Sequence, residues 1–332
     1  MKSIRQRPIL SRKLASNLIL AALGLAVALG ALAWLTDRRA SVREAAAMAA
    51  YPPEGQFVDV DGARVHAVVR GQGPDLVLIH GASGSARDFT FDLVGRLEGD
   101  FRVIAFDRPG MGWSDPHPTD PASPIAQADT LRAAADILGV RAPIVLGHSY
   151  GGAVAMAWAL DARDPPKAIV LLAGATHPWP GDLGLFYRVL TNGFGQRIVI
   201  PLVTAFGPRS QAVAVAEGIF DPQSPPPGYT EHIGITMSMR RDTLALNALQ
   251  VNGLKPYVTR MAPRYRALQM PIEIVHGTAD TIVGIAFHSE KMIEEVESAR
   301  LTRLDGIGHM PHHVDTPAVL AAITRARDRA MD

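Results

Sequence analysis

Gly147-His148-Ser149-Tyr150-Gly151 (GHSYG) is the stretch that decides the fold, because of the segments on either side of it. Residues 142–146 (APIVL) form a short apolar run that predicts a buried strand. Residues 152–160 (GAVAMAWAL) are rich in Ala and predict a helix. Gly-x-Ser-x-Gly between a strand and a helix predicts a sharp turn that lifts the serine side chain clear of the sheet. Ser149 is therefore a candidate nucleophile. The Tyr150 N–H, at the start of the helix, is a candidate donor to a developing negative charge.

The composition limits the classes of protein that the chain can belong to. Its 332 residues allow one large domain with an appendage, or two domains. The 33 basic residues almost balance the 32 acidic ones, so no bulk charge favours nucleic acid or an acidic partner. The chain has no cysteine, which excludes disulfides, thiolate catalysis and cysteine-ligated metals, and leaves the redox compartment open.

The N-terminal region predicts a membrane span. Leu18–Leu35 is an uncharged, almost wholly apolar run, and as a helix it would reach about 27 Å, close to the thickness of a bilayer's hydrocarbon core. Its length and Trp34, which suits a membrane interface, favour a retained anchor. The alternative is a signal peptide cleaved at Ala31-Leu32-Ala33, which would release a secreted protein.

Charges around this run predict the orientation of the anchor. Five basic residues precede it (Lys2, Arg5, Arg7, Arg12 and Lys13) and three follow it (Arg38, Arg39 and Arg43). This bias places the N-terminus in the cytoplasm and the body on the outer side, periplasmic or extracellular. The expected organisation is a basic segment at 1–17, a span at 18–35, a linker at 36–55 and a folded domain at 56–332. Within the linker, 37–50 is charged and Ala-rich and fits either a helix or a linker, and Pro52-Pro53 ends any helix there.

Strands and helices alternate through the body. An Asp61-Gly62 turn predicts a hairpin of strands at 57–60 and 64–70. Further strands are expected at 76–80, 102–106, 142–146, 168–173, 272–276 and 301–304, with helices at 88–97, 125–138, 152–160 and 289–296 and from 317. This rhythm predicts an α/β fold with a mostly parallel sheet covered on both faces. Residues 177–268 interrupt it with helical patterning, and predict an inserted helical lid over the strand ends.

Two more residues follow strands in the positions that a catalytic serine needs. Asp280 comes just after the strand 272–276, and His309 follows the strand 301–304. Each alone also fits a structural role, Asp280 as a turn or cap residue and His309 as a surface-loop histidine. Together with Ser149 they form the ordered set of nucleophile, acid and base that a Ser-His-Asp triad requires. Backbone N–H groups of Ala82, after the strand 76–80, and of Tyr150 are the expected oxyanion hole.

The body from Gln56 onward resembles the α/β-hydrolase superfamily. The motifs that carry the resemblance are His80-Gly81, Asp107–Ser114 (DRPGMGWS), the GHSYG elbow, Gly277–Asp280 and Gly308-His309. The resemblance implies that Asp107 belongs to a structural turn, and that a helical lid influences the choice of substrate. Dehalogenases and epoxide hydrolases of this superfamily use an Asp nucleophile, so Ser149 argues against those activities.

The sequence therefore predicts a membrane-anchored serine hydrolase that cleaves carboxylic esters through Ser149, His309 and Asp280. The apolar insert and the anchor favour a small, lipophilic ester as substrate, with no cofactor and no nucleic-acid partner. No metal is expected, because none of His80, His148 and His276 has the i, i+4 helical spacing of a metalloprotease motif. The adjacent His312 and His313 are also poorly placed to chelate an ion. Amide or C–C bond hydrolysis, acyl transfer and cofactor-free peroxidation stay open, since the same triad serves them. A non-catalytic binding protein is the alternative from another class.

Overall fold

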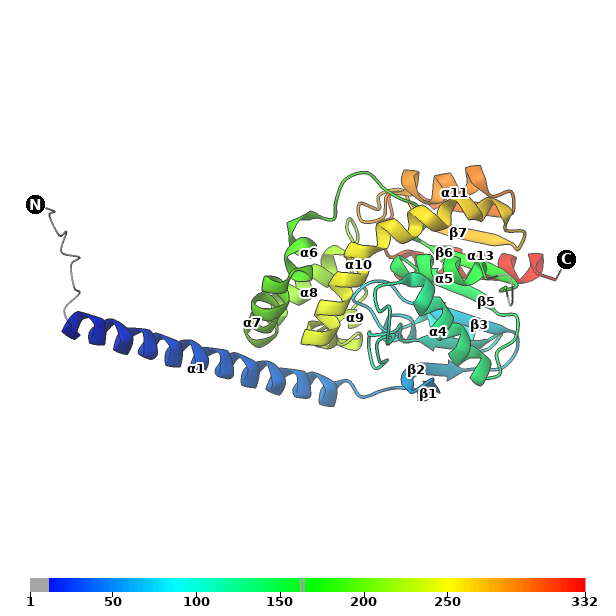
Figure 1. Cartoon of the computed structure of the whole chain (residues 1–332). Coiled ribbons are helices and arrows are strands. Elements are labelled where there is room, and N and C mark those ends of the chain that lie inside the picture. The colour runs from blue at the N-terminus through cyan, green and yellow to red at the C-terminus, as the bar shows by residue number, and fades with distance from the viewer. Residues whose placement is uncertain (1–11, 162, 164, 332) are drawn as a thin grey trace, which may run out of the picture.

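An eight-stranded sheet forms the centre of the molecule (Figure 1). The computed structural model describes residues 12–161, 163 and 165–331. The strands lie in the order β1-β2-β4-β3-β5-β6-β7-β8. β2 is antiparallel to both β1 and β4, and the remaining neighbours are parallel. The expected mostly parallel α/β sheet is confirmed. The strand bounds are β1 Gln56–Val60, β2 Ala63–Arg70, β3 Asp75–Ile79, β4 Arg102–Phe106, β5 Ile144–His148, β6 Ala168–Leu172, β7 Ile272–Gly277 and β8 Ala299–Leu304.

The alternation of side chains along each strand builds two separate cores. In β3, Val77 and Ile79 belong to the core on one face, whereas Leu76 and Leu78 belong to the core on the other face. Successive side chains of a strand point to opposite faces, so a continuous apolar strand can supply both cores. Helices α4 (Pro124–Ile137) and α5 (Tyr150–Ala159) cover the first face, and α3 (Leu93–Leu97) and α13 (Thr316–Arg329) cover the second.

Shorter helices complete the body. They are α2 Arg87–Thr90, η4 Ile285–Phe287, α11 Ser289–Glu295 and α12 Pro311–Val314. The single helix expected at 88–97 is wrong, because α2 and α3 are separate. The chain breaks at Asp92, whose φ of −148° and ψ of −50° lie outside the helical region.

A helical insert separates β6 from β7. It contains α6 Gly184–Thr191, η1 Gly195–Val199, α7 Ile200–Phe206, α8 Arg209–Gly218, α9 Tyr229–His232, η2 Ile235–Met239, α10 Arg241–Met261 and η3 Ala262–Ala267. Figure 1 shows α6, α7, α8 and α9 gathered at one end of the sheet, from which α10 runs along the body. This is the end where the strands finish, since Asn247 of α10 contacts the loop after β3. We call residues 177–268 the insert.

Helix α1 (Arg12–Ala50) runs without a break from the apolar region to the body. Its apolar part is long and hydrophobic enough to cross a membrane and is not buried against the body. Its C-terminal part packs on the insert, where Thr36, Ala40 and Ala47 are buried. Residues 37–50, for which the sequence allowed a helix or a linker, are thus the continuation of α1. Of the basic N-terminal segment, residues 1–11 lie outside the described residues.

Candidate active site

Ser149 sits on a tight turn between β5 and α5. Its backbone has a φ of +52° and a ψ of −118°, a conformation that residues other than glycine rarely adopt. The neighbouring glycines are needed because the backbone is crowded. A Cβ at Gly147 would lie 2.3 Å from the Gly151 carbonyl oxygen, and a Cβ at Gly151 would lie 2.1 Å from the Ile79 oxygen. The sequence motif therefore folds into the sharp turn that a nucleophile elbow requires.

The three residues expected to form a triad come together at the strand ends. His309 Nε2 lies 2.9 Å from Ser149 Oγ, and His309 Nδ1 lies 2.7 Å from Asp280 Oδ2. All three side chains are buried, with 4–9% of each residue exposed. A buried serine, histidine and carboxylate in this order form a proton-transfer chain.

The surroundings of Asp280 keep it ionised. Its Oδ1 accepts hydrogen bonds from the N–H groups of Ile282 and Val283, at 2.8 and 2.9 Å. Burial alone would raise the Asp280 pKa, but hydrogen bonds from His276 and His309 hold it well below its ordinary value. The ionised carboxylate can only accept hydrogen bonds. His309 Nδ1 therefore carries a proton and donates a hydrogen bond to Asp280. His309 Nε2 is left free to accept the Ser149 hydroxyl proton.

His276 is a second histidine on Asp280 that sequence reasoning did not connect to the triad. Its Nε2 lies 2.8 Å from the Val283 carbonyl oxygen and 3.0 Å from Asp280 Oδ2, so this nitrogen is a donor. Its Nδ1 then accepts from Ser289 Oγ at 2.6 Å. The i, i+4 spacing of His276 and Asp280 was visible in the sequence, but the strand-to-turn geometry that joins them was not.

Two backbone N–H groups beside Ser149 are free. Within the part of the chain that the structure describes, neither the Ala82 N–H nor the Tyr150 N–H makes a hydrogen bond. The loop after β3 lies against the elbow, because a Cβ at Gly81 would be 3.1 Å from Ser149 Cβ. Unpaired N–H groups are rare in protein interiors, so two beside a candidate nucleophile are a notable pair of donors.

The insert holds this loop in place. The Ser83 N–H donates to Asn247 Oδ1 at 2.7 Å, and Ser238 Oγ donates to the Ser83 carbonyl. Ser83 has a φ of +56°, so its backbone conformation depends on these contacts. Sequence reasoning did not identify Asn247 or Ser238, because neither belongs to a motif.

The buried guanidinium of Arg108 also holds the loop after β3 in place. Arg108 is fully buried, donates to the carbonyl oxygens of His80 and Gly81 at 2.9 and 3.0 Å, and lies 4.4 Å from the centre of the Tyr150 ring. Burial lowers the pKa of Arg108 to about 10, which still leaves it charged at neutral pH. The Arg108 N–H donates to His80 Nε2, so His80 Nδ1 must carry the proton that binds the Gly81 oxygen.

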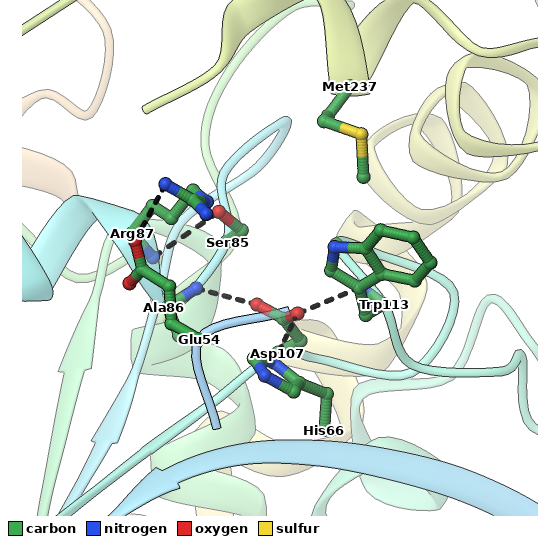
Figure 2. Close-up of a pocket in the computed structure, with 9 residues that line it drawn as sticks. Glu54, His66, Ser85, Ala86, Arg87, Asp107, Trp113 and Met237 are labelled. Carbon is green, nitrogen blue, oxygen red and sulfur yellow. Dashed lines mark hydrogen bonds and ion pairs between the residues drawn. The ribbon is translucent and has the colours of Figure 1, made fainter. Parts of the chain in front are cut away.

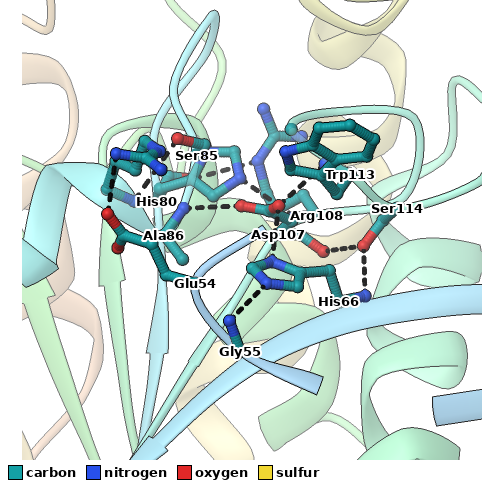
Figure 3. Close-up of polar contacts among 12 residues, drawn as sticks. Glu54, Gly55, His66, His80, Ser85, Ala86, Asp107, Arg108, Trp113 and Ser114 are labelled. Carbon is teal, nitrogen blue, oxygen red and sulfur yellow. Dashed lines mark hydrogen bonds and ion pairs between the residues drawn. The ribbon is translucent and has the colours of Figure 1, made fainter. Parts of the chain in front are cut away.

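The Asp107 turn is a hydrogen-bonded hub (Figure 3). Asp107 accepts from the N–H groups of Ala86 and Trp113 and from His66 Nδ1, at 2.7–2.8 Å. A Cβ at Gly112, where φ is +52°, would lie 2.2 Å from the Asp107 carboxylate, so only glycine fits there. Burial alone would raise the Asp107 pKa, but the hydrogen bond from His66 helps to lower it overall. These contacts agree with the structural role expected for this turn.

The cavity drawn in Figure 2 lies beside the Asp107 turn and away from the triad. It is bordered by residues such as Glu54, Arg87 and Trp113, and its volume of about 10 Å³ is no more than one water molecule needs. A second hollow, of about 290 Å³, is lined by residues such as Arg70, Glu98 and His232. Neither is lined by Ser149 or His309.

A histidine cluster lies directly behind the triad. His148 Nε2 is 3.1 Å from the His309 carbonyl oxygen, and Asp88 accepts from Tyr229 Oη, His313 Nε2 and His312 Nε2 at 2.8–3.1 Å. The ligand atoms of Asp88, His148 and His312 lie within 4.8 Å of one another, close enough for a metal ion.

The donors of this cluster fit a metal poorly. A metal on His312 Nε2 would leave a buried Nδ1–H, and this nitrogen has no hydrogen-bond partner in the structure. Metal-bound histidines nearly always donate their second N–H to an acceptor. The cluster is better explained as a buried carboxylate held by three hydrogen-bond donors. Burial and the neighbouring His313 accordingly lower the pKa of His312 to about 4.

A family model for the alpha/beta hydrolase family matches residues 76–323. The chain belongs to the alpha/beta hydrolase family. The hydrolase class expected from the sequence is thus confirmed at the level of the family. Among curated proteins, the chain is 31% identical over 308 residues to the polyketide synthase ThaQ of Burkholderia thailandensis. That match covers 86% of this chain but only 14% of ThaQ, so it relates this hydrolase to a small part of a much longer protein.

Two solved structures of similar fold match different shares of this chain. An esterase from Thermogutta terrifontis has a TM-score of 0.65 at 21% identity and covers 83% of this chain and 99% of its own. A membrane phospholipase A, described as a bacterial virulence factor, has a TM-score of 0.65 at 20% identity. It covers 94% of this chain and 99% of its own. The uncovered 6% is shorter than the 39 residues of α1, so the match includes part of this helix. At these identities the likeness concerns the fold.

Proposed function

We propose that this hydrolase cleaves carboxylic esters through an acyl-enzyme on Ser149. The observation that carries the proposal is the chain Ser149–His309–Asp280, with bonds of 2.9 and 2.7 Å, beside two unpaired N–H groups. A serine hydroxyl becomes nucleophilic when an oriented base can take its proton, and the ionised Asp280 orients His309 for that task.

The reaction begins when Ser149 Oγ attacks the ester carbonyl carbon while His309 Nε2 takes the hydroxyl proton. The N–H groups of Ala82 and Tyr150 stabilise the oxyanion that forms, and one such donor can contribute about 3 kcal/mol in the transition state. When the intermediate collapses, His309 protonates the departing alkoxide and the acyl group stays on Ser149. Water, activated by His309 in the same way, then releases the carboxylic acid. No step requires a metal or a cofactor.

The insert acts as a lid in this proposal. Ser149, His309 and Asp280 are each less than a tenth exposed, and Asn247 of the insert bonds to the loop that carries the oxyanion donor. A substrate therefore reaches Ser149 only when part of the insert moves. The apolar insert and the apolar half of α1 favour an uncharged, lipophilic ester.

Helix α1 is the membrane anchor in this proposal. Its apolar part is exposed over its whole length and can cross a bilayer. The charge bias around it places the body on the outer side of the membrane. The similarity to a membrane phospholipase A over 94% of this chain agrees with an anchored arrangement.

A series of p-nitrophenyl esters of increasing acyl length tests the substrate class. We expect the full-length enzyme in detergent to hydrolyse them, with kcat/KM rising from acetate to about hexanoate, because each buried methylene contributes about 0.8 kcal/mol. The Ser149→Ala variant should be inactive on every ester. Turnover of matched p-nitroanilides but not of the esters would assign the triad to amides instead.

A further inference from the structure

A stripe of large apolar side chains is exposed along η1 and α7. Phe194, Ile198, Leu202 and Phe206 follow one another at intervals of four residues, and 42–65% of each is exposed. Leu185 and Phe186 of α6 are exposed by 68 and 59%. Residues four apart lie on one face of a helix, so the stripe is continuous. Soluble proteins seldom expose apolar patches of this kind without a partner.

The opposite side of the same helices is also apolar. Ile200 and Ala205 are buried, in the packing between α7, α10 and α1. The pair 195–206 and 209–218 is as apolar as a membrane span, but it bends by 100° at the break between α7 and α8. A helix pair bent this sharply suits a position along a membrane surface with its apolar face in the interface.

The charges around the stripe have one sign. Between Asp182 and Glu217 the chain has no acidic residue and three arginines, Arg188, Arg197 and Arg209. All three are exposed, and none forms an ion pair with another residue that the structure describes. Apolar groups flanked by unpaired arginines are complementary to an anionic lipid surface.

The stripe lies close to the C-terminal end of the apolar segment of α1. Arg39 Nε donates to the Ala205 carbonyl at 2.7 Å, and the Arg39 guanidinium lies 5.2 Å from the centre of the Phe206 ring. Arg39 is only about 6 Å along the helix from Leu35, the end of the apolar run. Figure 1 shows α6, α7 and α8 at the end of the body that faces the apolar half of α1.

We propose that α6, η1 and α7 form a membrane-docking surface. The apolar stripe enters the headgroup boundary of the bilayer that α1 crosses, and Arg188, Arg197 and Arg209 bind anionic lipid phosphates. This inference rests on the anchor in the proposed function. It also gives the lid a direct contact with the membrane, because the docking surface and Asn247 belong to the same insert. A lipophilic ester can then pass from the bilayer to Ser149 without crossing water.

Single cysteines can test this contact cleanly, since the chain has no cysteine of its own. The probes are Phe194→Cys and Leu202→Cys on the docking surface, each labelled with bimane in the full-length protein. Leu25→Cys reports on the apolar part of α1. Ile137→Cys is the matched control, 61% exposed and at the end of α4 that leads into β5, on the sheet edge away from the insert. The protein is placed in nanodiscs of phosphatidylethanolamine and phosphatidylglycerol, with or without lipid-attached nitroxide.

The lipid nitroxide should quench probes 25, 194 and 202, several-fold more than probe 137, whereas aqueous iodide should quench only probe 137. Quenching of probe 25 alone, with 194 and 202 open to iodide, would overturn the docking surface and leave the anchor standing. Probes 194 and 202 shielded from both quenchers would overturn it in favour of a second copy of the chain. If probe 25 were not quenched, the anchor and the docking surface would both be wrong.

Activity supplies a second readout. Phe194→Asp/Leu202→Asp should lower hydrolysis of an uncharged ester dissolved in the nanodisc bilayer, such as p-nitrophenyl octanoate, several-fold, because charges in the stripe oppose insertion. Its turnover of water-soluble p-nitrophenyl acetate should stay unchanged, which separates this effect from a failure of Ser149 chemistry. Equal rates on the nanodisc ester for the double variant and the Ile137→Asp control would contradict the docking surface.

Discussion

Arg241 donates three hydrogen bonds to Glu44, a residue 197 positions earlier in the chain. Its backbone N–H and Nε bind one carboxylate oxygen at 2.8 and 2.9 Å, and its Nη2 binds the other at 2.7 Å. Arg241 is the first residue of α10, whose Asn247 binds the loop beside Ser149. Helix α1 is thereby fastened to the element that covers the candidate active site.

Two truncations separate the membrane role of α1 from its packing role. A protein that begins at residue 36 should keep esterase activity and thermal stability, because residues 14–35 have little contact with the body. A protein that begins at residue 51 should have a Tm several degrees lower, since it exposes the surface of the insert that the buried part of α1 covers. Arg241→Ala in the longer protein should shift the Tm in the same direction. Equal Tm values for both truncations would show that residues 36–50 do not stabilise the insert.

Replacing His309 and the nearby His313 by alanine, one at a time, tests whether His309 is the base. His309→Ala should lower kcat for p-nitrophenyl butyrate by about 10⁴-fold or more, since triad residues act as a unit. His313→Ala removes a hydrogen bond to Asp88 instead, and should lower the Tm while retaining most of the turnover. Kinetics and melting curves of the two purified variants distinguish these roles. If His313→Ala lost most of its kcat while His309→Ala stayed active, His309 would not be the base.

Asp280→Asn should leave the fold intact and slow catalysis. The amide oxygen can still accept from the N–H groups of Ile282 and Val283, whereas an amide NH₂ facing His309 favours the wrong tautomer of its ring. A change of this kind lowers kcat by about 10⁴-fold in a well-studied serine protease. Steady-state kinetics and circular dichroism check the two halves of the prediction. Full activity in the folded variant would remove Asp280 from the mechanism.

His288 should make the fold sensitive to acid below about pH 6.5, the ordinary pKa of histidine. Its Nδ1 accepts from the N–H groups of Thr176 and His177, so this nitrogen is unprotonated in the fold. Burial, with a smaller effect of His177, lowers the His288 pKa to about 3. The unfolded chain therefore binds the proton more readily, and stability falls as the pH drops from 6.5 towards 3. The loss between pH 7 and pH 5 is roughly 2 kcal/mol for one such group.

His288→Asn is the matched variant for this effect, because its side-chain oxygen can accept from the same two N–H groups but does not titrate. Melting curves at pH 7 and pH 5 should show a smaller drop in Tm for His288→Asn than for the parent protein. An identical drop in both proteins would mean that other groups cause the acid sensitivity.

The central strands and the three candidate triad positions could be predicted because each depends on local sequence. Apolar runs of five residues set the strands, and the GHSYG glycines set the turn at Ser149. In a parallel sheet the strand ends meet at one edge, so Asp280 and His309 could be expected near Ser149 before any contact was known.

The supports of the site depend on contacts between distant parts of the chain. Arg108 binds Gln127 and Gln250, and Asn247 binds Ser83 across 164 residues. No periodicity or motif marks such pairs, because long-range packing alone brings them together. The packing of residues 36–47 on the insert is of the same kind: composition indicates a helix there, but not the surface that it covers.

Covalent labelling tests most directly whether Ser149 is the nucleophile. The full-length protein in detergent is treated with a fluorophosphonate, digested, and mapped by mass spectrometry. We predict one adduct per chain, on Ser149, with labelling lost in Ser149→Ala and strongly slowed in His309→Ala. An active enzyme that is not labelled, or whose adduct lies on another residue while Ser149→Ala keeps its esterase activity, would show that Ser149 is not the nucleophile.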